Sequence, residues 1–343
     1  MTQRDLTLDI AKGILILLVL IGHGIQFPFG PEYLESNAFF TNPIFQFIYS
    51  FHMPLFMLLS GYFFFESNKK NLRQVVISRL KSIAIPLFAF SFLCNLMGGV
   101  ACIFRHGDLW QGMCRMLLGY NNLWFLAALL FCTFLTAALT RLFRSQALQY
   151  VAMALLVFAL MFLPDGFIAA EYKFVLPFFF IGYICRNYQL IPPSKLLQSN
   201  GIIAIATITS ALAIWWFDEN TYIYISKYAW SRGEFLDQVF INSKRIIIAI
   251  VLSITVLLYI YRFTAYLNCS FLIKLGQASL FIYGVNTLID VYYPSLLRFL
   301  NINLEFNYMI SIAFVILNIV VCLLLYKICN ASQLLRILFV GKK

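Results

Sequence analysis

The sequence predicts an all-α, polytopic membrane protein with about ten transmembrane helices and both termini in the cytoplasm. Of its 343 residues, 62% are hydrophobic and only 11% are charged, and the mean hydropathy is +0.84. Soluble domains contain about 25% charged residues, so much of this chain must be solvated by lipid. The apolar residues also form runs of membrane-spanning length, and the basic residues collect on one side of these runs.

Each predicted span is a mostly apolar run of about 20 residues. The sixth run is short and contains Pro177. No soluble domain, low-complexity linker or internal repeat interrupts the series, so we expect residues 1–343 to form a single integral membrane domain. The ten runs lie at about 8–28, 44–65, 83–104, 121–140, 148–164, 173–186, 200–217, 245–262, 271–289 and 308–328.

The distribution of charge predicts the orientation of the chain. With the N-terminus in the cytoplasm, most of the 25 lysines and arginines fall in inner segments and most of the 14 acidic residues in outer segments. This agrees with the positive-inside rule and puts both termini in the cytoplasm. The net charge of +11 therefore reflects topology, and we expect no nucleic-acid partner. The eight cysteines include no Cys-x-x-Cys pair, so no metal site is expected.

The first span carries ionisable groups at both ends. Lys12 and His23 are eleven residues apart, close to three helical turns, so they share one helix face about 16 Å apart. Asp9 precedes Lys12 by three residues and can pair with it. Lys12 could simply extend to the inner interface, and His23 could be satisfied by a neighbouring helix. Ionisable residues inside a membrane nevertheless usually mark a functional site.

Two further groups draw attention. His52 lies in the outer half of the second span, near the expected depth of His23, and Pro54 can kink the helix beside it. Arg79 and Lys81 lie at the entrance of the third span, after the most basic loop of the chain. They could anchor the inner face or hold a phosphorylated cytosolic ligand.

Several of these segments resemble the acyltransferase-3 family of integral membrane acyltransferases. LDIAKGILILLVLIGH at 8–23 and FHMPLFMLLSGYFF at 51–64 are similar to its first two motifs, and together they are specific. RLKSIAIP at 79–86, LWFLAALL at 123–130, LPFFFIGY at 176–183 and LGQASLFIYGVN at 275–286 resemble later motifs. The Phe-His-Met-Pro form is most similar to the branch named for fucose 4-O-acetylase.

The resemblance implies a ten-helix enzyme of a bacterial inner (plasma) membrane. Such an enzyme moves an acyl group, usually acetyl, from cytosolic acetyl-CoA to a hydroxyl of a cell-envelope glycan or lipid-linked sugar. Acetyl-CoA is then a substrate, and no permanently bound cofactor is expected. Two positions depart from the family pattern. Lys12 replaces an arginine and loses bidentate phosphate recognition, and Asn286 replaces a histidine that could transfer a proton.

The resemblance, read with the residues, assigns a role to each candidate. His23 would act as general base on the acceptor hydroxyl or carry the acyl group transiently, and His52 is the second choice for the base or an orienter of the hydroxyl. Lys12, Arg79 and Lys81 would hold the donor phosphates. Trp124 and Tyr283 would line the tunnel, and Asn286 would supply a hydrogen bond; packing is an equal alternative for both aromatic residues.

Two other classes of protein remain open at this stage. A transporter or flippase of a glycan or lipid-linked sugar could use the same polar core without chemistry, although such proteins often show repeat symmetry. A membrane sensor or scaffold could keep the fold without activity. The expected partners are an acyl-CoA, a glycan or lipid-linked acceptor and the lipid bilayer, with a homo-oligomer as a possibility.

Overall fold

The computed structural model describes residues 6–166, 168–190, 199–226, 228, 234–267 and 269–341. Within these residues the chain is helical and contains no β-strand, as predicted. The chain divides into two compact units. Unit 1 consists of Met1–Leu15, Gln46–Val75 and Phe131–Ile273, and unit 2 of Ile16–Phe45, Val76–Leu130 and Lys274–Lys343. That residues 1–343 work as a single domain stays a prediction.

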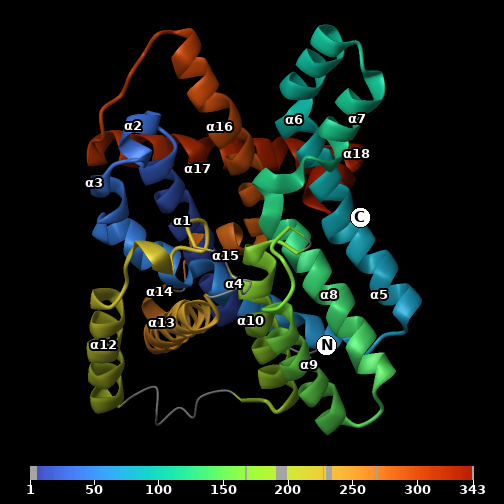
Figure 1. Cartoon of the computed structure of the whole chain (residues 1–343), viewed down its shortest axis with the longest axis vertical. Helices are drawn as coiled ribbons and strands as arrows, with labels where there is room; N and C mark the ends of the chain where they lie inside the picture. Colours follow the sequence, from blue (N-terminus) through green and yellow to red (C-terminus); the bar gives the residue numbers. More distant parts are fainter. Residues whose placement is uncertain are drawn as a thin grey trace. The chain divides into compact units, whose positions relative to one another are not determined.

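Unit 1 is built around α4, α10 and α13. It contains the first part of α1 (Leu6–Gln26), most of α4 (Pro43–Asn68), the last part of α8 (Trp124–Leu142), α9 (Gln146–Leu160), α10 (Ala170–Asn187), α12 (Asn200–Trp215), η3 (Glu219–Thr221), α13 (Phe235–Arg262), α14 (Thr264–Leu267) and the start of α15 (Ser270–Gln277). Helices α12 and α13 lie side by side in this unit (Figure 1).

Two glycines bring the backbones of α4 and α10 into direct contact. A Cβ atom added at Gly61 would collide with the carbonyl of Phe179, and one added at Gly182 would collide with the carbonyl of Leu58. Small residues that permit such approach are a common means of packing membrane helices, because dispersion contacts replace the hydrophobic driving force there. Gly61 and Gly182 therefore serve the close packing of α4 on α10.

Unit 2 is organised along α6. It contains the second part of α1, α2 (Pro31–Leu34), α3 (Asn37–Phe40), the end of α5 (Leu72–Arg79), η1 (Leu80–Ala84), α6 (Ile85–His106), α7 (Leu109–Leu118), η2 (Tyr120–Leu123), the start of α8, the end of α15, α16 (Ser279–Phe299), α17 (Tyr308–Ala331), α18 (Gln333–Leu335) and η4 (Arg336–Val340).

Helix α6 contacts η1, α7, η2, α16 and η4. It forms a hairpin with α7 (Figure 1), and it packs on α16 and on η4. Both η1 and η4 are π-helices, in which the i→i+5 pattern widens the turn. They pack on each other, and Gly341, with φ +68°, fits tightly against the backbone of Ser82. A residue with a Cβ atom is disfavoured at Gly341 on both counts.

The predicted spans agree with the helices in position, and their number stays a prediction. Each of the ten apolar runs is helical, and the ninth divides into α15 and α16. Within the described residues, six helices are long and apolar enough to cross a membrane, and α15 with α16, bent by 74°, would form a seventh. Helices α9 and α12 are shorter. The cytoplasmic placement of the termini also stays a prediction.

Three predicted boundaries are wrong. The third run is expected to begin at 83, but α5, η1 and α6 form one helical stretch from Leu72 to Arg105. The ninth run was expected to end at 289, but α16 continues to Phe299; the eighth was expected to begin at 245, but α13 begins at Phe235. Hydropathy ends a span where charged residues begin. Asp290 of α16 is paired with His23, and Lys244 of α13 is paired with Asp218. Because these charges are balanced, the two helices continue past them.

Candidate functional site

His23 lies in the last turn of α1 and meets a polar group on α16. Its Nδ1 atom is 2.5 Å from Oδ2 of Asp290 and 2.6 Å from the side-chain nitrogen of Asn286. Two lone pairs cannot face each other at 2.5 Å, so a proton lies between the imidazole and the carboxylate. When that proton is on Nδ1, the opposite ring nitrogen, Nε2, is an acceptor.

A second asparagine fixes the orientation of the first. The amide nitrogen of Asn318, on α17, donates to Oδ1 of Asn286 at 3.1 Å. The amide nitrogen of Asn286 is thereby directed toward Asp290, to whose Oδ2 it donates at 2.7 Å. Asn286 and Asn318 are fully buried, whereas the His23 side chain keeps 17% of its surface exposed. The histidine is thus held by a buried polar chain and remains accessible.

The sequence identifies two of the four residues in this hydrogen-bonded network of His23, Asp290, Asn286 and Asn318. It singled out His23 and Asn286, and the structure brings them into contact. It missed Asp290 and Asn318. The available signal was that Asp290 follows Asn286 by four residues, which places both on one helix face, in an otherwise apolar segment where a carboxylate usually marks a site.

The two predicted aromatic residues, Trp124 and Tyr283, belong to unit 2 and both contact Phe125. The rings of Trp124 and Tyr283 both contact the ring of Phe125, at centroid distances of 6.0 and 5.8 Å. Tyr283 also donates a hydrogen bond to the backbone oxygen of Asn122 at 3.5 Å. Tyr283 is three residues before Asn286 and shares its helix face. Phe125 thus lies between the two aromatic rings, and a tunnel lined by Trp124 and Tyr283 stays a prediction.

His52 belongs to unit 1 and is only 3% exposed. Its Nδ1 is 2.6 Å from the backbone oxygen of Ile48, a pure acceptor, so Nδ1 carries the proton. The ring also meets Tyr49 edge-on at 4.9 Å. His52 is thus fixed in one tautomer, and its proximity to His23 and its role stay predictions.

The pairing predicted for Lys12 is confirmed. Its Nζ atom is 2.9 Å from Oδ1 of Asp9, which is buried, and it lies 4.5 Å from the centre of the Phe63 ring. The Lys12 side chain keeps 23% of its surface exposed. Because Asp9 already balances much of its charge, a role in holding phosphate stays a prediction.

Arg79 and Lys81 lie where two π-helices meet. Arg79 ends α5, Lys81 lies within η1, and Arg336 opens η4, which packs on η1. The Nε atom of Arg336 and the hydroxyl of Ser82 are buried without a hydrogen-bond partner among the described residues. Buried polar groups without partners are costly, so this end of unit 2 suits a ligand with many acceptor oxygens. Sequence reasoning missed Arg336 and Ser82, which carry no recognisable motif.

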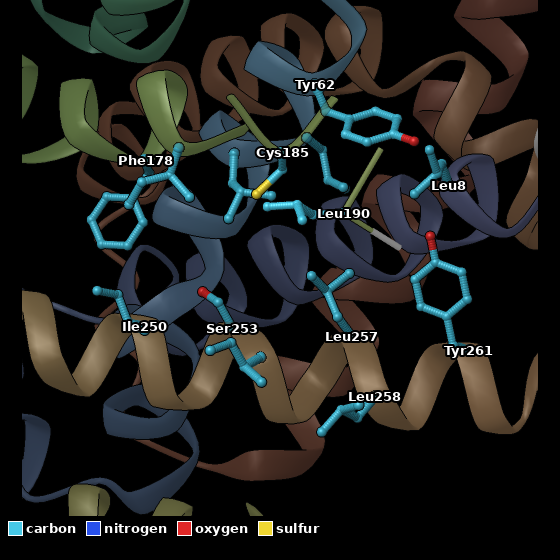
Figure 2. A pocket seen from close by; sticks show the side chains of 14 residues that line it. Leu8, Tyr62, Phe178, Cys185, Leu190, Ile250, Ser253, Leu257, Leu258 and Tyr261 are labelled. Atoms are coloured by element: carbon cyan, nitrogen blue, oxygen red, sulfur yellow. The ribbon is translucent and has the colours of Figure 1, made fainter. Parts of the chain in front are cut away.

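Unit 1 also contains an apolar cavity of about 260 Å³ between α1, α4, α10 and α13. Its walls are mainly leucine and isoleucine side chains, with Phe178 at one end and the rings of Tyr62 and Tyr261 at the other (Figure 2). The Ser253 hydroxyl is directed from α13 toward the cavity (Figure 2) and has no hydrogen-bond partner among the described residues. Sequence reasoning did not anticipate this cavity.

Two further ion pairs of unit 1 join helices α10 and α13 to the segments that precede them. Nζ of Lys244 is 2.5 Å from Oδ2 of Asp218, and Nζ of the fully buried Lys173 is 2.7 Å from Oδ1 of Asp165. Burial acts to raise the pKa of Asp218, but hydrogen bonds from Lys244 and Thr221 outweigh it, and the pKa lies below its ordinary value. These charges are already paired within the protein, which leaves His23 and Asp290 as the better candidate for chemistry.

Comparison with known proteins adds the family. Residues 5–327 match a family model described as an acyltransferase domain. The chain is 32% identical over 188 residues to nodulation protein NolL of Sinorhizobium fredii. This matched stretch covers 53% of this chain and 49% of that protein. The chain is 33% identical over 187 residues to nodulation protein NolL of Mesorhizobium japonicum, and this stretch covers 53% and 48%.

The chain spans about half the length of the curated relatives it matches. No solved structure matches it. The family model, in contrast, covers almost the whole chain, including His23, Asp290 and Asn318. The chain therefore belongs to the acyltransferase-3 family.

Proposed function

We propose that this protein is a membrane O-acyltransferase that transfers an acetyl group from cytosolic acetyl-CoA to a hydroxyl of a cell-envelope glycan or lipid-linked sugar. The observation that carries the proposal is the pairing of His23 with Asp290 in apolar surroundings. A histidine whose Nδ1 proton is held by a carboxylate presents Nε2 as a base, as in other acyl-transfer enzymes. The family membership supports the same reaction class.

In the proposed reaction, Nε2 of His23 removes the proton of the acceptor hydroxyl. The hydroxyl oxygen attacks the thioester carbonyl, the carbon–sulfur bond breaks, and the departing CoA sulfur takes the proton from His23. Asp290 acts through His23 by stabilising the imidazolium. Arg79, Lys81 and Lys12 would hold the donor phosphates, His52 would orient the hydroxyl, and the protein needs no permanently bound cofactor.

The proposed setting is a bacterial inner membrane with both termini in the cytoplasm. This orientation puts η1, which contains Lys81 and precedes α6, on the side of the cytosolic donor. It puts the α6–α7 hairpin on the outer side, where an envelope glycan is available. The charge distribution along the chain supports this placement.

The deciding experiment follows radiolabelled acetyl from acetyl-CoA in inside-out vesicles that contain the protein. We expect the wild type to label glycan and His23→Gln to do so at least 10²-fold more slowly, the usual effect of losing a general base. Equal rates would make His23 structural and overturn the mechanism. Label trapped on the protein would indicate a covalent intermediate. Movement of glycan across the membrane without use of acetyl-CoA would favour a transporter.

A further inference from the structure

A cleft of about 650 Å³ opens between the last turns of α6 and the helix α7. The residues that line it are Gly98, Ala101, Cys102 and Arg105 on α6 and Gln111, Cys114 and Arg115 on α7. Pockets of a few hundred to a thousand cubic ångströms are typical of small-ligand sites. The cleft is therefore large enough for one or two sugar units.

The cleft is positively charged and contains no balancing acid. Arg105 and Arg115 both line it, and neither forms an ion pair in the part of the chain that the structure describes. Asp108, the acidic residue between them in sequence, does not line the cleft; its Oδ1 accepts the backbone N–H of Gln111 at 2.8 Å and caps α7. Guanidinium groups match the planar, bidentate geometry of carboxylates and phosphates.

The guanidinium group of Arg115 lies against the backbone of α6 at Gly98. A Cβ atom at Gly98 would lie 3.3 Å from Nε of Arg115, so the guanidinium rests directly against the backbone of α6. The nearby glycines Gly99 and Gly112 allow α6 and α7 to approach closely, because a Cβ atom at either would lie 2.9 Å from the carbonyl oxygen of the other. The hairpin thus presents Arg115 from a closely packed base.

Helix α6 links the cleft to the His23 site. The hydroxyl of Tyr292, two residues beyond Asp290, donates to the backbone oxygen of Leu93 on α6. Gly98 lies about 8 Å farther along the helix and Arg105 about 18 Å farther, in the direction away from Lys81. Moving along α6, one therefore passes the proposed donor side, then the level of Asp290, then the cleft.

We propose that this cleft binds an anionic group of the acceptor, so that the acceptor is an acidic glycan or a sugar linked to a lipid through phosphate. The inference rests on the proposed function and on its orientation. Arg105 and Arg115 would hold the carboxylate or phosphate, and Gln111 a neighbouring hydroxyl. The reacting hydroxyl would then extend along α6 toward His23.

The test uses inside-out vesicles from cells that contain the native acceptor, with radiolabelled acetyl-CoA added outside. Labelled glycan is extracted and separated by anion exchange, before and after mild acid that cleaves sugar–phosphate–lipid linkages. The variants are Arg105→Gln/Arg115→Gln and the charge-preserving Arg105→Lys/Arg115→Lys. The control is Arg298→Gln, which removes an exposed cation elsewhere on α16.

We expect the label to enter the acidic fraction. The double glutamine variant should slow this labelling by about 10- to 100-fold, the usual effect of losing charged hydrogen bonds, while the double lysine variant keeps part of the rate and Arg298→Gln keeps all of it. Charge that survives mild acid identifies a carboxylate or phosphate on the glycan, and charge lost in mild acid identifies the lipid-linking phosphate. Either result supports the inference.

Two results would overturn it. Label in the neutral fraction would mean that the acceptor carries no anion, and equal rates for wild type and both double variants would mean that the cleft does not bind it. A different result, no glycan labelling above that of His23→Gln in any sample, would contradict the proposed function itself. The two failures are therefore distinguishable.

Discussion

Oδ2 of Asp290 lies 2.5 Å from Nδ1 of His23, although the two residues are 267 positions apart in the chain. Oδ2 also accepts from Asn286, whereas Oδ1 of Asp290 is buried without a hydrogen-bond partner among the described residues. All hydrogen bonding of the carboxylate is thus concentrated on the oxygen that faces His23. This arrangement orients the imidazole, and it gives the first prediction.

Replacing Asp290 with asparagine should slow acetyl transfer by about 10²-fold or more while the protein remains folded. An asparagine of the same shape removes the charge that stabilises the imidazolium and can favour the wrong tautomer. The measurement is the transfer rate as a function of pH, because a change in the profile separates an effect on His23 from a general loss of folding. Glu305→Gln, in an exposed segment, serves as the control. An unchanged rate and profile would remove Asp290 from the site.

Asn318→Leu should destabilise the protein and lower its activity together. The substitution leaves Oδ1 of Asn286 buried without its donor, which costs about 1–3 kcal/mol, and it frees the Asn286 amide to flip away from Asp290. Thermal unfolding in detergent and the transfer rate measure the two effects. Asn330→Leu is the matched control, because Asn330 donates only to a backbone oxygen of its own helix. If both variants behave alike, Asn318 does not orient Asn286.

The helices and one side of the site could be predicted from sequence because they leave local signals. Apolar runs of spanning length predicted the helices, and the three-residue spacing of Asp9 and Lys12 predicted their ion pair. His23 was recognised because an imidazole in an apolar run is unusual. In each case the informative residues lie within one or a few helical turns of one another.

The remainder depends on contacts that sequence alone does not report. The sequence does not reveal the role of Asp290, because a carboxylate lowers local hydropathy and therefore marks the end of a predicted span. Its partner, His23, lies on α1, 267 residues away in the chain. Arg336 follows the last apolar run and looks like an ordinary inner-face cation. Only the packing of η4 on η1 brings the helix that Arg336 opens against the helix that contains Lys81 and Ser82.

Arg336→Gln should weaken use of the donor and raise the KM for acetyl-CoA by about tenfold. The reason is the buried, unpartnered Nε of Arg336 beside η1, where an anion would satisfy it. Charged hydrogen bonds of this kind contribute about 1.5–3 kcal/mol. Lys327→Gln, which removes an exposed cation from the end of α17, should leave the KM unchanged. An equal KM in wild type and Arg336→Gln would make Arg336 a structural residue only.

The ion pair between Asp218 and Lys244 should make stability depend on pH in the acid range. The folded-state pKa of Asp218 lies below its ordinary value of 3.8. The pair therefore stabilises the fold above about pH 4, and this contribution disappears as the pH falls through the folded-state pKa. The measurement compares thermal unfolding of wild type and Asp218→Asn between about pH 6 and pH 3. The difference in Tm should shrink toward low pH, and a constant difference would contradict the assignment.

Gly182→Ala should separate α4 from α10 and reduce the amount of folded protein. The added methyl group would collide with the backbone at Leu58, and a backbone cannot move aside as a flexible side chain can. Overpacking of this kind costs about 1–3 kcal/mol or more. The control is Gly166→Ala, where a Cβ atom meets nothing within 4 Å. Size-exclusion profiles and thermal unfolding of the purified proteins give the comparison. Equal stability of the two variants would mean that α4 and α10 do not meet through their glycines.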